Sequence, residues 1–257
     1  MNRKASIFFW PFFLLVLLIL FSYGLYRVFT KENTINDTLY VGVNQYKINS
    51  AYDLFESKNL FFEKVSAMSY HDSIYYLYNN GGKFNFNCGQ EQGYVLWKVG
   101  SLNCFVDKKE FVDSFEKVFS SNLAIGTKDY INIPVVDNLN FVYNENFVYF
   151  NTKSKLIVQK DNVEYQDYLY SGVKESLPVD EVIQVSAEAR NYITQCKEDL
   201  NCYLVNTQNS AFSWSIKNNG KLFMFDVNTN RKIGLFEKKD LVLKFGVDFK
   251  ELNPLFG

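Results

Sequence analysis

The chain has 257 residues, and its 27 basic and 28 acidic side chains leave it close to neutral. This balance provides no basic stripe for phosphate groups, so we expect no nucleic acid among its partners. Aromatic residues reach 18%, which we attribute to an AT-rich genome rather than to a sugar-binding surface. The length allows one large domain or two small ones with a true core.

The first predicted element is an apolar helix close to the N-terminus. Ala5–Tyr26 contains no charged side chain, and a helix of that length rises by about 33 Å, enough to cross a hydrocarbon core of roughly 30 Å. Basic side chains flank the run equally on both sides, so only the terminal amine favours a cytoplasmic N-terminus. We predict a single-pass signal-anchor that contacts membrane lipid.

A cleavable signal peptide is the alternative interpretation of this run. Ser22-Tyr23-Gly24 has the form of a cleavage site, and cleavage after Gly24 would remove the helix. The apolar residues Leu25 and Tyr26 beyond that site favour a retained anchor. A pilin-like N-terminus is disfavoured, because the run holds no acidic residue and no processing site precedes it. Both interpretations place residues 32–257 outside the cytoplasm. With the retained anchor we expect a single-pass protein of the cell membrane whose C-terminal domain is extracytoplasmic.

Between the anchor and the exported helices we predict a tether and a strand. Residues 32–38 are polar and lack periodicity, which is typical of a tether. Asn36-Asp37-Thr38 is an N-glycosylation sequon, so Asn36 is a possible glycosylation site just outside the membrane. Leu39–Ile48 begins with an apolar, β-rich run that predicts a strand.

Two amphipathic helices are predicted next. The first begins at Asn49 or Ser50 and keeps an apolar face to Met68, and Asn79-Asn80-Gly81-Gly82 is a strong stop signal. The second begins at Asp107, because Asp107-Lys108-Lys109-Glu110 has the form of a capping box ahead of an apolar stripe. Two short strands, Lys83–Phe86 and Tyr94–Val99, lie between these helices.

The rest of the chain predicts two antiparallel meanders on either side of a third helix. The first meander has alternating runs at Asn138–Tyr143, Phe147–Asn151 and Leu156–Val158. The helix lies within Leu177–Asp199. The second meander has runs at Phe212–Ile216, Leu222–Val227, Ile233–Phe236 and Leu241–Phe245, with turns at Asn218–Gly220 and Asn228–Asn230.

Helices followed by hairpins, without regular βαβ alternation, indicate an α+β fold. We predict a single N-terminal transmembrane helix followed by an extracytoplasmic domain of antiparallel β meanders packed with two or three helices. The predicted boundaries are 1–31 for a cytoplasmic stub and the anchor, 32–38 for the tether, 39–160 for an α+β subdomain, and 161–257 for a helix plus the C-terminal meander.

The four cysteines predict disulfides. Cys88, Cys104, Cys196 and Cys202 all lie in the part expected outside the cytoplasm, and an even number suits a disulfide framework. Of the three possible pairings we favour the local one, Cys88–Cys104 and Cys196–Cys202. A metal site is disfavoured, because no C-x-x-C pair exists and the sole histidine is distant in sequence.

Catalytic chemistry finds little support in the sequence. His71 is the only histidine, and although Tyr70-His71-Asp72-Ser73 gathers triad residue types, neighbours on a helix point in different directions. No phosphate-binding loop or calcium loop is present, so we predict no cofactor and no metal. Paired carboxylates stay open, because a glycosidase needs only two acids at the right separation. The candidate acids are Glu91, Glu110, Glu145, Glu164 and Asp167.

The layout resembles a group of membrane-anchored exported proteins, of unknown function, from small-genome archaea. The resemblance rests on the basic-led apolar anchor, on Asn79-Asn80-Gly81-Gly82-Lys83-Phe84 at the end of a helix, on Asn103-Cys104 before a long helix, and on Ile131-Asn132-Ile133-Pro134 before a strand set. It covers residues 50–160 and implies no functional residues.

These observations predict a binding or assembly module of the cell envelope, held at the membrane, whose partner is a protein or another envelope component. One alternative is a hydrolase of envelope polymers that uses two carboxylates. Another is an accessory subunit of a membrane complex, in which the anchor helix itself makes contacts.

Overall fold

The computed structural model describes residues 6–128, 130 and 139–250, with the side chains of residues 6–13 and 28–40 outside the description. The chain divides into two compact units. One comprises Met1–Glu56 with Ile157–Gln166, and the other comprises Ser57–Leu156 with Asp167–Gly257. The domain boundaries predicted at residues 31, 38 and 160 stay a prediction.

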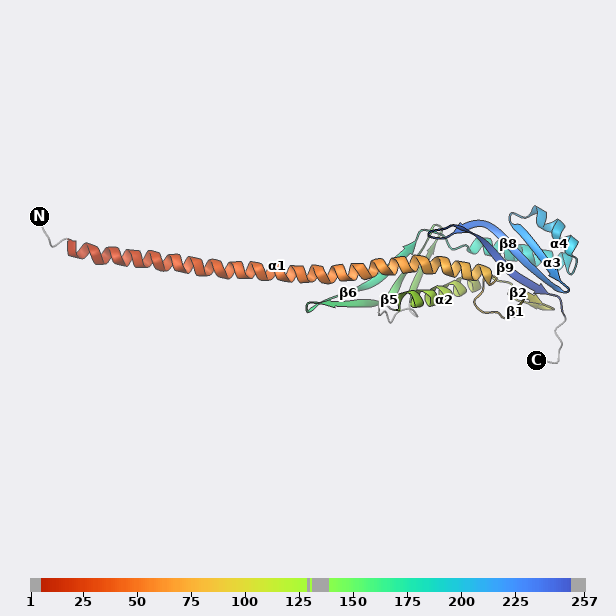
Figure 1. Cartoon of the computed structure of the whole chain (residues 1–257), viewed down its shortest axis with the longest axis horizontal. Coiled ribbons are helices and arrows are strands. Elements are labelled where there is room, and N and C mark those ends of the chain that lie inside the picture. The colour runs from red at the N-terminus through yellow and green to blue at the C-terminus, as the bar shows by residue number, and fades with distance from the viewer. Residues whose placement is uncertain (1–5, 129, 131–138, 251–257) are drawn as a thin grey trace. The chain divides into compact units, whose positions relative to one another are not determined.

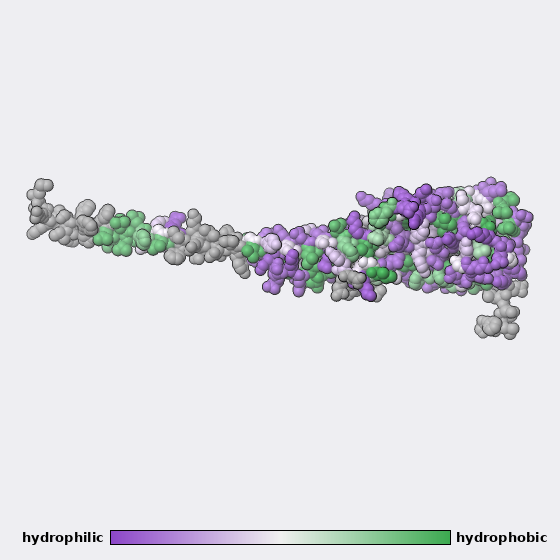
Figure 2. Space-filling model, viewed as in Figure 1, coloured by the Kyte–Doolittle hydropathy of each residue, from purple (hydrophilic) through white to green (hydrophobic). Residues whose placement is uncertain are grey.

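The described part of the chain is an α+β protein with antiparallel-rich sheets, as predicted (Figure 1). Its first element is α1, Ser6–Asn79. Figure 2 shows a green, hydrophobic band on this helix between two grey stretches. The exposed apolar residues of the helix include Leu14, Leu18 and Phe21. Over the part of the chain that the structure describes, no helix is both long and apolar enough to cross a membrane. The predicted span begins outside the described side chains.

The strand predicted at Leu39–Ile48 is wrong, since these residues and the tether residues 32–38 are helical in α1. A helix satisfies its own N–H and C=O groups, whereas a strand needs a neighbour. None of the described strands pairs with this segment. The β propensity of these residues does not decide their structure, because such propensities depend strongly on the surroundings of a residue.

The predicted stop signal after Asn79 is confirmed. Gly81 and Gly82 have φ values of 62° and 75°, which favour glycine. The Gly82 N–H donates to the Leu77 carbonyl at 2.7 Å, the six-to-one bond of a Schellman motif. The Trp97 indole N–H donates to the Gly81 carbonyl at 2.9 Å and so ties this helix end to the following sheet.

In the first unit, the tip of a hairpin packs on α1. The hairpin joins β5 (Phe147–Lys160) to β6 (Val163–Val173) through Asp161 and Asn162, whose φ values of 50° and 65° fit a two-residue type I′ turn. The ring of Tyr165 lies 5.5 Å from that of Tyr52 and 5.1 Å from that of Phe55. These edge-to-face contacts bury Phe55.

In the second unit, a three-stranded sheet packs one face on two helices. Its order is β4 (Leu139–Asn144), β5 and β6. Phe150 of β5 lies 4.7 Å from Phe119 of α2 and 6.1 Å from Phe62 of α1, ring to ring. This inner face is buried, whereas alternate residues on the outer face are exposed.

Helix α2, Lys108–Thr127, begins as predicted at its cap, Asp107, whose carboxylate accepts from the Glu110 N–H at 2.8 Å. It runs alongside the C-terminal part of α1 (Figure 1). The two helices approach closely at Gly126, where an added Cβ would lie 2.5 Å from a methyl group of Val65.

The second sheet of this unit has six strands in the order β1-β2-β9-β8-β7, with β3 beside β2. Its strands are β1 (Gln90–Glu91), β2 (Tyr94–Val99), β3 (Leu102–Asn103), β7 (Ser213–Asn219), β8 (Leu222–Ile233) and β9 (Lys239–Asp248). Only β2 and β9 pair in parallel. Trp97, Phe245 and Phe225 stack in its core, with ring separations of 3.7 and 4.9 Å.

Three short helical segments precede β7 in the chain. They are α3 (Val179–Cys196), α4 (Leu200–Asn206) and η1 (Thr207–Asn209). Tyr203 of α4 packs on Phe223 and Phe225 of β8, at ring separations of 5.3 and 5.5 Å. Helix α3 confirms the helix predicted within Leu177–Asp199.

Several predicted boundaries in the strands are wrong. Lys83–Phe86 is not a strand, and the Lys83 side chain turns inward to Glu110. The runs predicted separately at Phe147–Asn151 and Leu156–Val158 belong to one strand, β5, in which the Thr152 hydroxyl donates to the Ser154 carbonyl at 2.7 Å. The turn predicted at Asn228–Asn230 is an irregularity within β8, so Ile233 belongs to that strand and Leu235–Phe236 to the loop after it.

Candidate functional site

The structure pairs the four cysteines as predicted. The hairpin disulfide, Cys88–Cys104, spans β1 to β3, and the helix disulfide, Cys196–Cys202, closes the passage from α3 to α4, with S–S lengths of 2.04 and 2.02 Å. No described cysteine is free. Both bonds therefore support the domain, and neither leaves a thiol for chemistry.

His71 lies in the interior of α1 without a triad around it. Its side chain is buried, and its Nδ1 has no hydrogen-bond partner and lies 3.8 Å from a carboxylate oxygen of Glu175. Burial lowers the pKa of His71, while the charge of Glu175 opposes that shift. Ser73 donates to the Ser69 carbonyl instead of to His71. A histidine-activated hydroxyl is therefore not assembled here.

The five acids proposed from the sequence occupy separate elements. Glu110 binds the buried Lys83 ammonium at 2.8 and 2.9 Å, and Glu91 lies 3.2 Å from Lys250. Glu164 accepts from Gln159 at the tip of the β5–β6 hairpin, Asp167 accepts from the Tyr168 N–H, and Glu145 lies in the β4–β5 turn. No cavity described below is lined by two of these acids.

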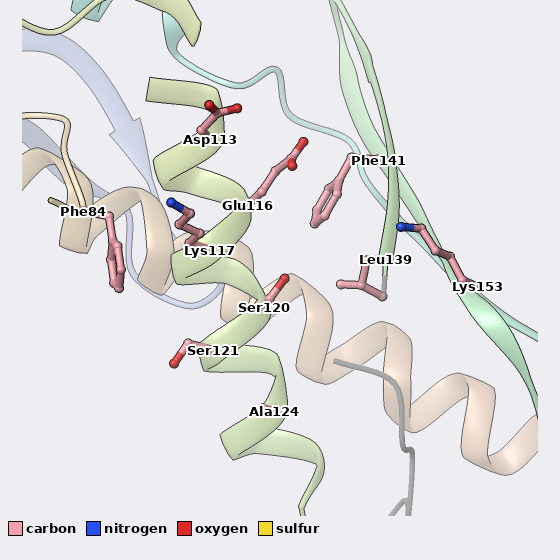
Figure 3. A pocket seen from close by; sticks show the side chains of 10 residues that line it. All are labelled: Phe84, Asp113, Glu116, Lys117, Ser120, Ser121, Ala124, Leu139, Phe141 and Lys153. Atoms are coloured by element: carbon pink, nitrogen blue, oxygen red, sulfur yellow. The ribbon is translucent and has the colours of Figure 1, made fainter. Parts of the chain in front are cut away.

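A cavity of about 690 Å³ brings together a different pair of carboxylates, Asp113 and Glu116. Figure 3 shows both projecting from α2 beside Lys117, with Phe141 opposite on β4. The two acids are three residues apart on one helix, so their side chains are neighbours. Glu116 accepts from the Tyr143 hydroxyl at 2.7 Å, and burial, then this contact, raises the pKa of Tyr143.

A second cavity, of about 400 Å³, lies between α1 and the loop from β8 to β9. Met68, His71 and Tyr75 line it from the helix, and Leu235 and Phe236 line it from the loop. Among the described residues, no group of three or more His, Cys, Asp or Glu side chains is placed to hold a metal ion.

The outer face of the three-stranded sheet exposes a group of tyrosines. Tyr149, Tyr168 and Tyr170 are 47%, 41% and 44% exposed, and Val142, opposite Tyr149 on β4, is 60% exposed. We call these four residues the tyrosine face. Because β strands alternate sides, the buried Phe150 and Leu169 point the other way.

The tyrosine face is held in place by a glycine and a lysine. The Tyr149 ring lies across Gly172, where an added Cβ would come within 2.8 Å of the ring. The Lys155 ammonium lies 5.7 Å from the centre of the Tyr168 ring, within the range of a cation–π contact. Sequence reasoning missed this face, although the alternation Glu-Tyr-Gln-Asp-Tyr-Leu-Tyr from residue 164 is partly visible.

Asn36, the possible glycosylation site, belongs to α1, and its side chain lies outside the described ones, so glycosylation stays a prediction. Comparisons with protein-family models, with curated proteins and with solved structures find no match to the chain.

Proposed function

We propose that the protein is a membrane-anchored, extracytoplasmic binding or assembly module of the cell envelope. The uncharged run Ala5–Tyr26 supports the anchor, because its apolar residues from Leu14 onward are exposed around the helix. Two disulfides support an oxidising exterior for the rest of the chain. The resemblance to anchored exported proteins agrees with this location.

The tyrosine face is the observation that carries the binding role. A tyrosine ring offers on the order of 200 Å² of contact area with a polar end, and such rings are enriched at protein interfaces. Three half-exposed rings on one sheet face form an apolar surface of a size typical of interaction sites. The partner proposed is a protein or another component of the envelope.

Crosslinking of the full-length protein in its native membrane tests this role. The Tyr168→Thr/Tyr170→Thr variant removes two rings but keeps residues that favour strands. We expect it to lose partners that the wild type captures. A matched control, Tyr46→Ala/Tyr76→Ala, removes two exposed tyrosines from α1 and should capture the same partners as the wild type. Identical capture by all three proteins would refute a role for this face.

The anchor has its own test. N-terminal sequencing of the mature protein should start at or near Met1, and a start at Leu25 would show that the helix is a signal peptide. Co-purification in mild detergent addresses the third reading, an accessory subunit of a membrane complex. Recovery of the protein without any partner would count against that reading.

The Asp113–Glu116 cavity favours an envelope-polymer hydrolase as the second candidate. Neighbouring carboxylates on one helix face are compatible with the roughly 5 Å separation used by retaining glycosidases. Asp113→Asn should then abolish release of reducing sugar from purified envelope polymer, while Glu145→Gln, outside the cavity, should not. Equal release by wild type and Asp113→Asn would exclude this chemistry.

A further inference from the structure

The loop from β8 to β9 presents one phenylalanine almost completely to solvent. Phe236 is 95% exposed and its neighbour Leu235 is 49% exposed. Gly234 has a φ of 143°, and an added Cβ there would collide with the Glu237 carbonyl, so only glycine fits this turn. Phe236 follows this turn by two residues, and its ring projects into solvent.

The 400 Å³ cavity lies directly beside this ring. Its wall on α1 includes Met68, which is half-exposed, and the buried His71, whose Nδ1 lacks a hydrogen-bond partner. A cavity of about 150 Å³ lined by apolar side chains is enough to hold a benzene molecule. The space is therefore ample for one additional phenyl ring.

We propose that this cavity receives Phe236 of a second copy of the chain, and that Phe236 of the first copy enters the cavity of the second. A projecting ring and a receiving cavity on one patch are what a twofold symmetric interface requires, since each surface meets its own copy. The interface covers the two Phe236 rings, one from each copy, which are in water when the chains are separate. This inference is independent of the proposed function.

The charges around the cavity fit the same occupant. Asp72 and Glu237 are acidic, whereas Lys238 and Lys239 are basic. Glu237 lies 3.8 Å from Lys239 of the same chain, so the rim is neutral as a whole and two identical rims can meet without net repulsion. A neutral rim also offers no excess of positive charge that would attract an anionic lipid surface.

Photo-crosslinking tests the contact itself. The full chain, with a benzophenone analogue of phenylalanine at position 236 and reconstituted in lipid vesicles, should form a dimer whose crosslink maps to Met68–Tyr75 of the other copy. A crosslink confined to one chain would overturn the proposal. In membrane extracts, a crosslink to a different protein would overturn it too.

Sedimentation equilibrium in detergent micelles measures the strength of the dimer. Phe236→Ser should weaken dimerisation by about 100-fold, because two rings are lost and each contributes at least about tenfold. Val205→Ser, at a residue of α4 that is 63% exposed, is the control and should leave the dimer unchanged. Because the Phe236 ring makes almost no contact in the single chain, its variant should fold normally. A monomeric wild type, or a Phe236→Ser variant as dimeric as the wild type, would refute the inference.

Discussion

The ion pair between Lys83 and Glu110 leads to an asymmetric prediction about stability. The Lys83 side chain is only 2% exposed, whereas that of Glu110 is 28% exposed. Glu110→Gln keeps the shape but leaves an ammonium group buried without a counter-charge. Removing one partner of a buried pair costs about 3–5 kcal/mol. Partial exposure of the site places the expected loss near the lower end, at about 3 kcal/mol.

Lys83→Met removes the other partner at a smaller cost. Methionine fills the apolar path of the lysine side chain, and the carboxylate of Glu110 can rotate to water, so we expect a loss of about 1 kcal/mol or less. The double variant should resemble Lys83→Met, because it no longer contains an unpaired buried charge. This order of stabilities follows from the difference in exposure alone.

Thermal unfolding of the full chain in detergent, with the disulfides intact, measures the effect. For a protein of about this size, 3 kcal/mol corresponds to a midpoint lower by about 6–12 °C. Lys83→Met should shift the midpoint by a few degrees at most. If Lys83→Met proves more destabilising than Glu110→Gln, the burial argument is wrong.

Three further predictions concern packing, crosslinks and pH. Gly126→Ala should lower the free energy of unfolding by about 1–3 kcal/mol through its clash with Val65, whereas Gly42→Ala, with nothing within 4 Å, should not lower it; urea titrations that rank them the other way would contradict the contact. The hairpin disulfide closes a loop of 16 residues and the helix disulfide a loop of 6. Replacing both cysteines should therefore lower the free energy of unfolding by about 3 kcal/mol for the hairpin disulfide and by about 2 kcal/mol for the helix disulfide. A larger loss for the helix disulfide would refute this order. Burial lowers the pKa of His71 in the folded protein. The neutral histidine therefore contributes fully to the free energy of unfolding above about pH 6.5, where the unfolded histidine is also neutral, and this contribution declines below that pH. His71→Gln should therefore lose less stability than the wild type between pH 7 and pH 5, and equal losses in urea midpoints would argue against this.

The elements that sequence predicts best are those with local signals. The cap at Asp107, the stop at Gly81-Gly82 and the hairpin between β7 and β8 each depend on residues adjacent in the chain. The turn of that hairpin is formed by Gly220 and Lys221, directly after Asn219. Cysteine spacing likewise identifies both disulfides, because each closes a short loop. Local chemistry decides these features whatever the tertiary fold.

The misses arise where distant residues decide. Leu39–Ile48 has the composition of a strand but lacks a neighbouring strand, and the helix wins. The second strand of the long hairpin, β6, was not predicted, because Asp161-Asn162 is a weaker turn signal than Asn-Gly. The parallel pairing of β2 with β9 joins segments about 150 residues apart, which no local pattern reveals.

The candidate sites were harder still to predict. Glu110 looked like a catalytic candidate and is instead the partner of a buried lysine, since only the fold brings Lys83 to it. The tyrosine face needs the pairing of β4, β5 and β6 to become one surface. Phe236 looked like the end of a strand, and its exposure depends on the turn at Gly234.

The position of β9 has a consequence for how the chain folds as it is made. This strand, Lys239–Asp248, is the last of the described strands, yet it lies between β2 and β8 in the sheet. Until it emerges, β2 and β8 have no common neighbour, and each presents an open edge to other chains. A chain that ends before Lys239 therefore lacks the middle of its sheet and not merely a tail. We infer that this sheet is completed only after residues 239–248 have been made, so products truncated before them should be especially prone to aggregation.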